Sequence, residues 1–164
     1  MNAWFRRLLL ILTIGGGFVG VTVTIQSLLH ANKVTAYIMA VVFLGLYGYG
    51  IFAGFKLSES SAPLRHLRLY FSLQIPFISS PFIAYRFCSG LEATVAIIQP
   101  GFRWGWDWRL GSAWQFVIHS SAHWGFGINL VALAIVFLLN SRLAGAPKMS
   151  MSRALTQPSA PADR

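Results

Sequence analysis

Charged residues are scarce in this sequence, and acidic ones above all. Asp and Glu together number 4 in 164 residues, and charged residues of both signs make up 10% of the chain. An ordinary soluble domain carries about 25% charged residues. With 55% hydrophobic residues and a mean hydropathy of +0.60, the folded chain would expose a large apolar surface to water. The composition therefore predicts an integral membrane protein, whose first partner is the lipid bilayer.

Cysteine is nearly absent, since Cys88 is the single thiol of the chain. One thiol excludes an intramolecular disulfide and the CxxC pairs of redox and zinc sites. The sequence also contains no phosphate-binding glycine loop and no nucleophile motif, which favours a non-enzymatic function. A net charge of +9 is typical of nucleic-acid-binding proteins. Here, however, the basic residues lie beside apolar runs, where they set membrane orientation, so we expect no nucleic-acid partner.

Four largely apolar segments predict an all-α fold, a bundle of four transmembrane helices within residues 1–143. Each has about 20 residues, enough to cross a hydrocarbon core of about 30 Å. The expected helices cover residues 8–29, 34–55, 67–87 and 120–140. Pro76 and Pro81 should kink or break the third helix, because each removes a backbone donor. A cleavable secretory signal is the alternative for the first segment, although that segment is longer than a typical signal core.

Small residues recur at four-residue spacing in the first two segments. Such stripes let two helix backbones approach closely in lipid, and they favour packing within one chain over dimerisation because a partner helix is already tethered. The residues concerned are Gly16, Gly20, Thr24, Ala36, Ala40, Gly50 and Gly54.

The distribution of Lys and Arg predicts the orientation of this bundle. Four helices would place both termini on one side, together with nine of the thirteen basic residues. An excess of Lys and Arg marks the cytoplasmic side. We therefore expect a multi-pass protein of the inner (plasma) membrane with both termini in the cytoplasm. Residues 144–164, rich in Pro, Ser and Ala, should form a disordered cytoplasmic tail.

Residues 101–109, GFRWGWDWR, alternate strictly between aromatic residues and charged residues or glycine. In an extended chain this alternation places the rings on one side and the charges on the other. Tryptophan favours the membrane–water boundary. The segment, which follows a short surface helix expected within 90–101, should therefore form an extracytoplasmic collar between the third and fourth helices. Its candidate interface residues are Phe102, Arg103, Trp104, Trp106, Asp107, Trp108 and Arg109.

Three further groups of residues are weighed as sites of chemistry: a histidine pair, a set of charges and a row of polar side chains. His119 and His123 are spaced for one face of a helix, where imidazoles bind zinc, copper or haem iron. No third ligand stands at a recognised spacing, so no cofactor is expected, and a haem or transition metal remains the alternative. Glu92 and Asp107 should balance Arg86, Arg103 and Arg109 on a wet surface. A polar pathway through the third and fourth helices would contain Gln74, Ser79, Ser80 and Asn129.

These observations predict a small protein that acts by protein–protein interaction, as an accessory subunit, assembly factor or immunity-type protein. It would act through its helix faces and the 101–109 collar, and its partner would be another membrane protein or a second copy. One alternative is a small transporter or channel that uses the proline-broken third helix. The other is a metal- or haem-binding membrane enzyme at His119 and His123.

Overall fold

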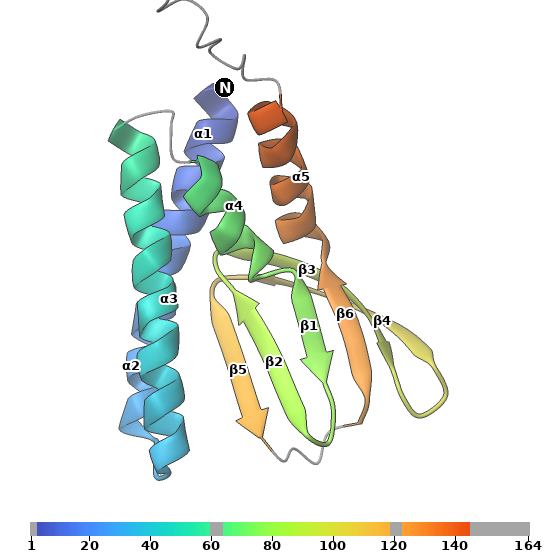
Figure 1. The fold of residues 1–164 in the computed structure, drawn as a ribbon. Coiled ribbons are helices and arrows are strands. Elements are labelled where there is room, and N and C mark those ends of the chain that lie inside the picture. The colour runs from blue at the N-terminus through green and yellow to red at the C-terminus, as the bar shows by residue number, and fades with distance from the viewer. Residues whose placement is uncertain (1–2, 60–63, 119–122, 145–164) are drawn as a thin grey trace, which may run out of the picture.

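The computed structural model describes residues 3–59, 64–118 and 123–144. Figure 1 shows helices joined to a six-stranded antiparallel sheet, which is an α+β fold. The expected all-α bundle of four transmembrane helices is therefore wrong. Two of its four helices are present, and the other two segments contain strands and shorter helices.

The N-terminal part is a hairpin of two long apolar helices. The first consists of α1 (Ala3–Leu10), a π-helical segment η1 (Ile11–Gly15) and α2 (Gly16–Leu29), and α3 (Val34–Glu59) follows it. Over 27 and 25 residues, these are the two helices in the described part that are long and apolar enough to cross a membrane. Only 39% and 33% of their most apolar windows are buried. Most of the hairpin surface is thus exposed and apolar, which fits lipid better than water.

The small residues of the hairpin are its contact points. A Cβ atom at Gly20 would overlap the ring of Tyr47, and one at Gly54 would lie 2.6 Å from the Thr13 hydroxyl oxygen. Gly50 is packed equally closely against Tyr70, which lies on α4 (Leu64–Ser72). The stripes of small residues therefore serve packing within the chain, as their spacing predicted.

The third expected helix, residues 67–87, is not formed. Helix α4 ends at Ser72, and the chain continues as β1 (Pro76–Ser79) and β2 (Ile83–Cys88). Pro76 cannot donate an intrahelical hydrogen bond, and it disfavours helical geometry at the residue before it. The prolines thus end the helix instead of kinking it.

The fourth expected helix, residues 120–140, is also wrong. Its first residues lie outside the described part, and β6 (Gly125–Asn129) precedes the short apolar helix α5 (Leu130–Ala144). Asn129 ends the strand and caps the helix, since its Oδ1 atom accepts hydrogen bonds from the amides of Val131 and Ala132 at 3.1 and 3.4 Å. The surface helix expected within 90–101 is likewise a strand, β3 (Leu91–Ile98).

The sheet has the order β4-β3-β6-β1-β2-β5, with β4 at Arg103–Leu110 and β5 at Ala113–Ile118. Pairs β3–β4 and β2–β5 are two arms of one long β-ribbon, residues 83–118. Its register continues unchanged from Ile98↔Arg103 to Ile83↔Ile118. The ribbon bends between its arms, at residues 89–90 and 111–112, and the arms flank the β6–β1 pair.

The bend requires glycine and is attached to the hairpin. Gly90 and Gly111 have φ angles of +87° and +115°, which other residues rarely adopt. The Ser89 hydroxyl donates a hydrogen bond to the Leu12 carbonyl at 3.1 Å, and the Ser112 hydroxyl donates one to the Gly16 carbonyl. Both carbonyls lie in or beside η1, where the π-helical turn departs from the regular α-helical hydrogen-bonding pattern. The irregular turn of the helix therefore holds the corner of the sheet.

We predict that Gly20→Ala destabilises the protein by about 1–3 kcal/mol, because the added methyl group overpacks the buried contact with Tyr47. Gly45→Ala is the matched control, since a Cβ atom there meets nothing within 4 Å. Thermal unfolding of both purified variants in detergent measures the difference. Equal melting temperatures for the two variants would contradict the described hairpin packing.

Candidate functional site

The two faces of the sheet differ sharply in chemistry. Directly paired residues of antiparallel strands lie on the same face, so the register assigns every side chain to a face. One face, which we name the ring face, carries Trp104, Trp106, Trp108, Val95, Ile97, Phe126, Ile128, Ile78, Tyr85, Phe87, Trp114 and Phe116. The opposite face, which we name the charged face, carries Arg103, Asp107, Arg109, Glu92, Thr94, Asn129, Ser79, Arg86 and Gln115.

The hairpin covers one end of the ring face. Trp114 stacks on Phe43 of α3 with ring centroids 4.5 Å apart, and Phe87 is buried between Phe43 and Tyr47. The strands stand beside the half of the hairpin that contains the α2–α3 connection (Figure 1). This packing fixes the orientation of the whole sheet against the two long helices.

The opposite end of the ring face is uncovered in the described part of the protein. Trp104, Trp106 and Trp108 are 75%, 78% and 65% exposed. They lie on β4, which has the extended conformation expected for this segment, with Arg103, Asp107 and Arg109 on the other face. Phe102 precedes the strand and is also exposed. Three neighbouring exposed indole rings form an apolar patch of the kind that marks an interaction site.

Strand β4 is also an edge of the sheet. It pairs with β3 on one side, and no described strand pairs with its other side. Its burial pattern contains no buried residue. A long, aromatic and unpaired edge strand is a template for another strand, and soluble proteins usually block such edges. The patch of exposed indole rings and the unpaired edge of the described sheet thus occur on the same strand.

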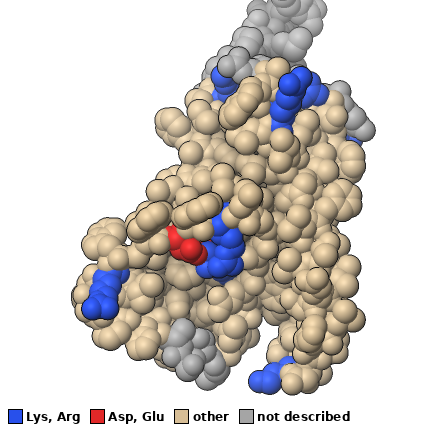
Figure 2. Space-filling view, turned by 180° about the vertical axis from the view of Figure 1, so that it is seen from behind, with Lys and Arg blue, Asp and Glu red and all other residues tan. Residues whose placement is uncertain are grey.

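Arg86 organises the charged face. Its Nε atom donates hydrogen bonds to both carboxylate oxygens of Glu92 at 3.0 and 3.1 Å, and its Nη2 atom donates one to Asp107 at 2.8 Å. The Thr94 hydroxyl donates a further hydrogen bond to Glu92 at 2.6 Å. Arg86 precedes the bend of the ribbon and Glu92 follows it, so this network joins the two arms. Figure 2 shows the acidic surface next to basic surface on this face.

A small pocket of about 230 Å³ adjoins this network, with Phe77, Ala96 and Ile98 among its lining residues. The Arg86 guanidinium lies over the Phe77 ring, 5.7 Å from its centroid. Because two carboxylates already bind Arg86, the pocket offers little attraction to an anion. The network therefore serves to hold the two arms of the ribbon together.

Glu92 and Asp107 pair with basic residues, as expected from the sequence. The Glu92 side chain, however, is only 3% exposed and does not lie on a wet surface.

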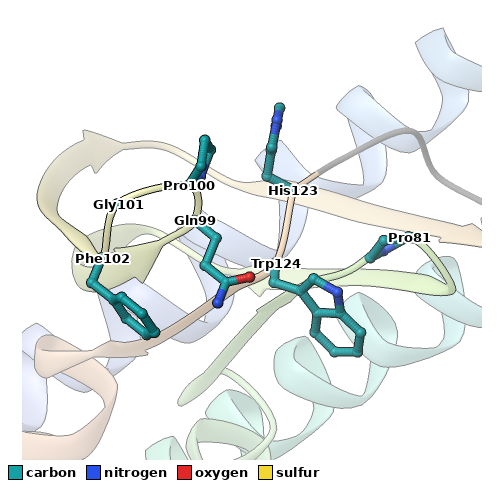
Figure 3. A pocket seen from close by; sticks show the side chains of 7 residues that line it. All are labelled: Pro81, Gln99, Pro100, Gly101, Phe102, His123 and Trp124. Carbon is teal, nitrogen blue, oxygen red and sulfur yellow. The ribbon is translucent and has the colours of Figure 1, made fainter.

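The predicted histidine pair lies partly outside the described residues, because His119 is not among them. His123 lines an open pocket of about 500 Å³ with residues such as Pro100, Phe102 and Trp124. In Figure 3 the side chains of His123 and Trp124 project in opposite directions. Within the described ranges there is no group of three or more His, Cys, Asp or Glu side chains that could hold a metal ion.

The four residues of the predicted polar pathway have separate local roles. Gln74 accepts a hydrogen bond from the Ser89 amide at 3.0 Å, and Asn129 caps α5. The Ser79 hydroxyl donates to the His123 carbonyl at 3.1 Å, and the Ser80 hydroxyl donates to the Ile83 carbonyl at 2.8 Å. Each of these hydrogen bonds thus stabilises a turn or a junction, whereas the buried amide nitrogens of Gln74 and Asn129 have no hydrogen-bond partner within the described residues.

Sequence reasoning missed the serines that attach the sheet to the hairpin. The dipeptides Ser89-Gly90 and Gly111-Ser112 are turn signals, and they stand opposite each other in the ribbon. This symmetry is visible only after the register is known.

Comparisons of the chain with protein-family models, with curated proteins and with solved structures gave no match.

We predict that Asp107 makes the protein sensitive to acid. The hydrogen bond from Arg86, together with the charges of Arg86 and Arg109, lowers the pKa of Asp107 below its usual 3.8. A lowered pKa contributes stability above the usual value, and this contribution is lost as the pH falls through the lowered pKa. Acid unfolding curves below about pH 4 should therefore converge for wild type and Asp107→Asn, with wild type more stable above that range. Parallel curves would contradict the Arg86–Asp107 contact.

We predict that Cys88 is unreactive in the folded protein. Burial raises the pKa of its thiol to about 12, and the side chain is fully enclosed. A maleimide reagent at pH 8 should label Cys88 only after unfolding, which mass spectrometry measures. Rapid labelling of the native protein would show that the ribbon bend opens.

Proposed function

We propose that this chain is a membrane-anchored interaction protein, whose helical hairpin holds the sheet so that β4 and the exposed rings bind a partner membrane protein. The observation that carries this proposal is the coincidence, on one strand, of three exposed tryptophans and a backbone edge with which no described strand pairs. The partner would contribute an extended segment with apolar side chains at alternate positions.

The chemistry of β4 favours protein over lipid or water as its cover. Lipid could cover the indole rings, but it offers no hydrogen bonds to the unpaired backbone groups of the strand. Water could satisfy those backbone groups, but it would leave a large aromatic patch exposed. An added strand satisfies both, because its backbone pairs with β4 while its side chains cover the rings.

We infer the membrane topology from the hairpin and its charges. Two crossings place the ends of the hairpin on the same side, and Figure 1 shows the N-terminal end of α1 and the C-terminal end of α5 together. Basic residues concentrate at this end, which the positive-inside rule assigns to the cytoplasm of a plasma (inner) membrane. The sheet then lies in the half of the molecule that is directed toward the extracytoplasmic side. These basic residues are Arg6, Arg7, Lys56, Arg65, Arg68 and Arg142.

Neither alternative function has support from the fold. The transporter hypothesis depended on a broken helix over residues 67–87, and that helix is absent. The metal or haem hypothesis depended on two histidines of which one is not described. Interaction through β4 is the hypothesis with an observed surface.

We predict that a photo-crosslinking side chain at Trp106 captures one discrete membrane protein in cells, whereas the same group at Trp4 does not. Trp4 is the matched control, because it is 73% exposed but lies on α1. Replacing Trp104 and Trp108 by alanine should reduce capture at position 106 more than tenfold, since aromatic anchors dominate interfaces. Thermal stability of the variants should match wild type. Adducts with lipid alone, or equal protein capture from position 4, would contradict the proposal.

A further inference from the structure

The end of the molecule opposite the α2–α3 connection is strongly basic. Helices α1, α3, α4 and α5 meet there, and each carries at least one Arg or Lys. Glu59, the last residue of α3, is the one acidic residue within these four helices as the structure bounds them. The Arg6 guanidinium donates a hydrogen bond to the Leu57 carbonyl at 3.0 Å, which ties the start of α1 to the end of α3.

Helix α4 is a short amphipathic helix fixed at this end. Leu67, Tyr70 and Phe71 are buried, and Tyr70 fills the space beside Gly50 of α3. Arg65 and Arg68 are three positions apart, so they neighbour each other on the exposed surface of the helix. Because the buried side is packed tightly, the two guanidinium groups are attached to a rigid support.

A groove of about 580 Å³ lies beside these arginines, lined by Tyr49, Arg65, His66, Arg68, Leu69 and Ser72. The hydroxyl of Tyr49 and Nδ1 of His66 are 2.9 Å apart, which fixes the wall between α3 and α4. Nη1 of Arg68 donates a hydrogen bond to Oδ1 of Asn140 on α5 at 3.2 Å. The groove therefore has a rim of cationic groups and an apolar side formed by Leu69. The exposed ring of Phe52 packs edge-on against the His66 ring, which also lines the groove.

The charges of this rim are not neutralised by described carboxylates. Arg65 and Arg68 form no ion pair within the described part of the chain, whereas Arg86 on the sheet binds two carboxylates. The groove thus differs from the pocket on the charged face, where the arginine is already saturated. Guanidinium groups bind phosphate through bidentate, charge-assisted hydrogen bonds, so two arginines that line one groove are suited to a phosphate group.

We propose that this groove binds the headgroup of an anionic phospholipid in the leaflet at this end of the hairpin. The phosphate lies between Arg65 and Arg68, and an acyl chain follows Leu69 and Phe52 along the hairpin. The surrounding basic residues favour a lipid with net negative charge over a zwitterionic one, because they repel a choline ammonium group. The site is independent of the partner proposed for β4.

The test is lipid retention by the full-length protein in mild detergent, measured by native mass spectrometry after exchange with phosphatidylglycerol or phosphatidylcholine. Wild type should retain phosphatidylglycerol in preference to phosphatidylcholine. Arg65→Gln and Arg68→Gln should each weaken this retention about fivefold, the factor that corresponds to about 1 kcal/mol for each basic side chain near an anionic surface. Arg103→Gln/Arg109→Gln is the control, because it removes two positive charges from β4.

Three outcomes would overturn the proposal: equal retention of the two lipids by wild type, unchanged retention by Arg65→Gln/Arg68→Gln, or an equal loss in the β4 control. Competition with inorganic phosphate distinguishes a lipid headgroup from a free anion as the ligand. Inorganic phosphate at millimolar concentration should not displace the lipid. Displacement would identify a free-anion site instead. Because both arginines are exposed, the variants should fold, and the single variant Arg65→Gln leaves the Arg68–Asn140 contact intact.

Discussion

The whole structure depends on the attachment of a bent β-ribbon to an irregular turn of a long apolar helix. Ser89 and Ser112, opposite each other at the bend, donate hydrogen bonds to carbonyls at and beside the π-helical segment. Tyr47 of α3 donates a third hydrogen bond, to the Cys88 carbonyl at 3.1 Å. These contacts join residues far apart in sequence, and they determine which end of the ring face is covered by the hairpin. The exposed tryptophans are a consequence, since the aromatic contacts of the hairpin with the sheet are made to the β2–β5 arm, through Phe87 and Trp114.

A second constraint separates the charges from the rings. A chain with so few acidic residues has two of them bound to Arg86, where the paired charges hold the two arms of the ribbon together. Removing one partner of a largely buried pair would leave an uncompensated charge, which is more costly than never forming the pair. The strand register places all charged residues of the described strands on the charged face, which leaves the ring face without charge. The sheet can therefore face an apolar neighbour on one side while Arg86, Glu92 and Asp107 bind one another on the other side.

The sequence predicted the two long helices correctly, because a run of more than twenty uncharged residues between basic residues has the length and composition of a helix that crosses a bilayer. It also predicted the extended conformation of residues 103–109 from their strict alternation. Residues 67–87 and 120–140 were assigned wrongly because apolar aromatic and β-branched runs suit a buried strand as well as a helix. Strand pairing is non-local, so neither the Gly125–Asn129 strand nor the burial of Glu92 against Arg86 could be read from neighbouring residues. For the candidate surface, the tryptophans were visible in the sequence, whereas the open edge of β4 required the strand order.

The unchanged register along the ribbon restricts how this sequence can vary in length. Side chains alternate between faces, so deleting one residue from either long strand would exchange rings and charges on one arm relative to the other. Matched deletions in both strands would preserve the faces but would shift Gly90 and Gly111 away from the helix turn that receives them. Insertions are therefore compatible with this architecture at the tip of the ribbon, beyond Ile98 and Arg103, and over evolutionary time the loop there is the part of the ribbon free to lengthen.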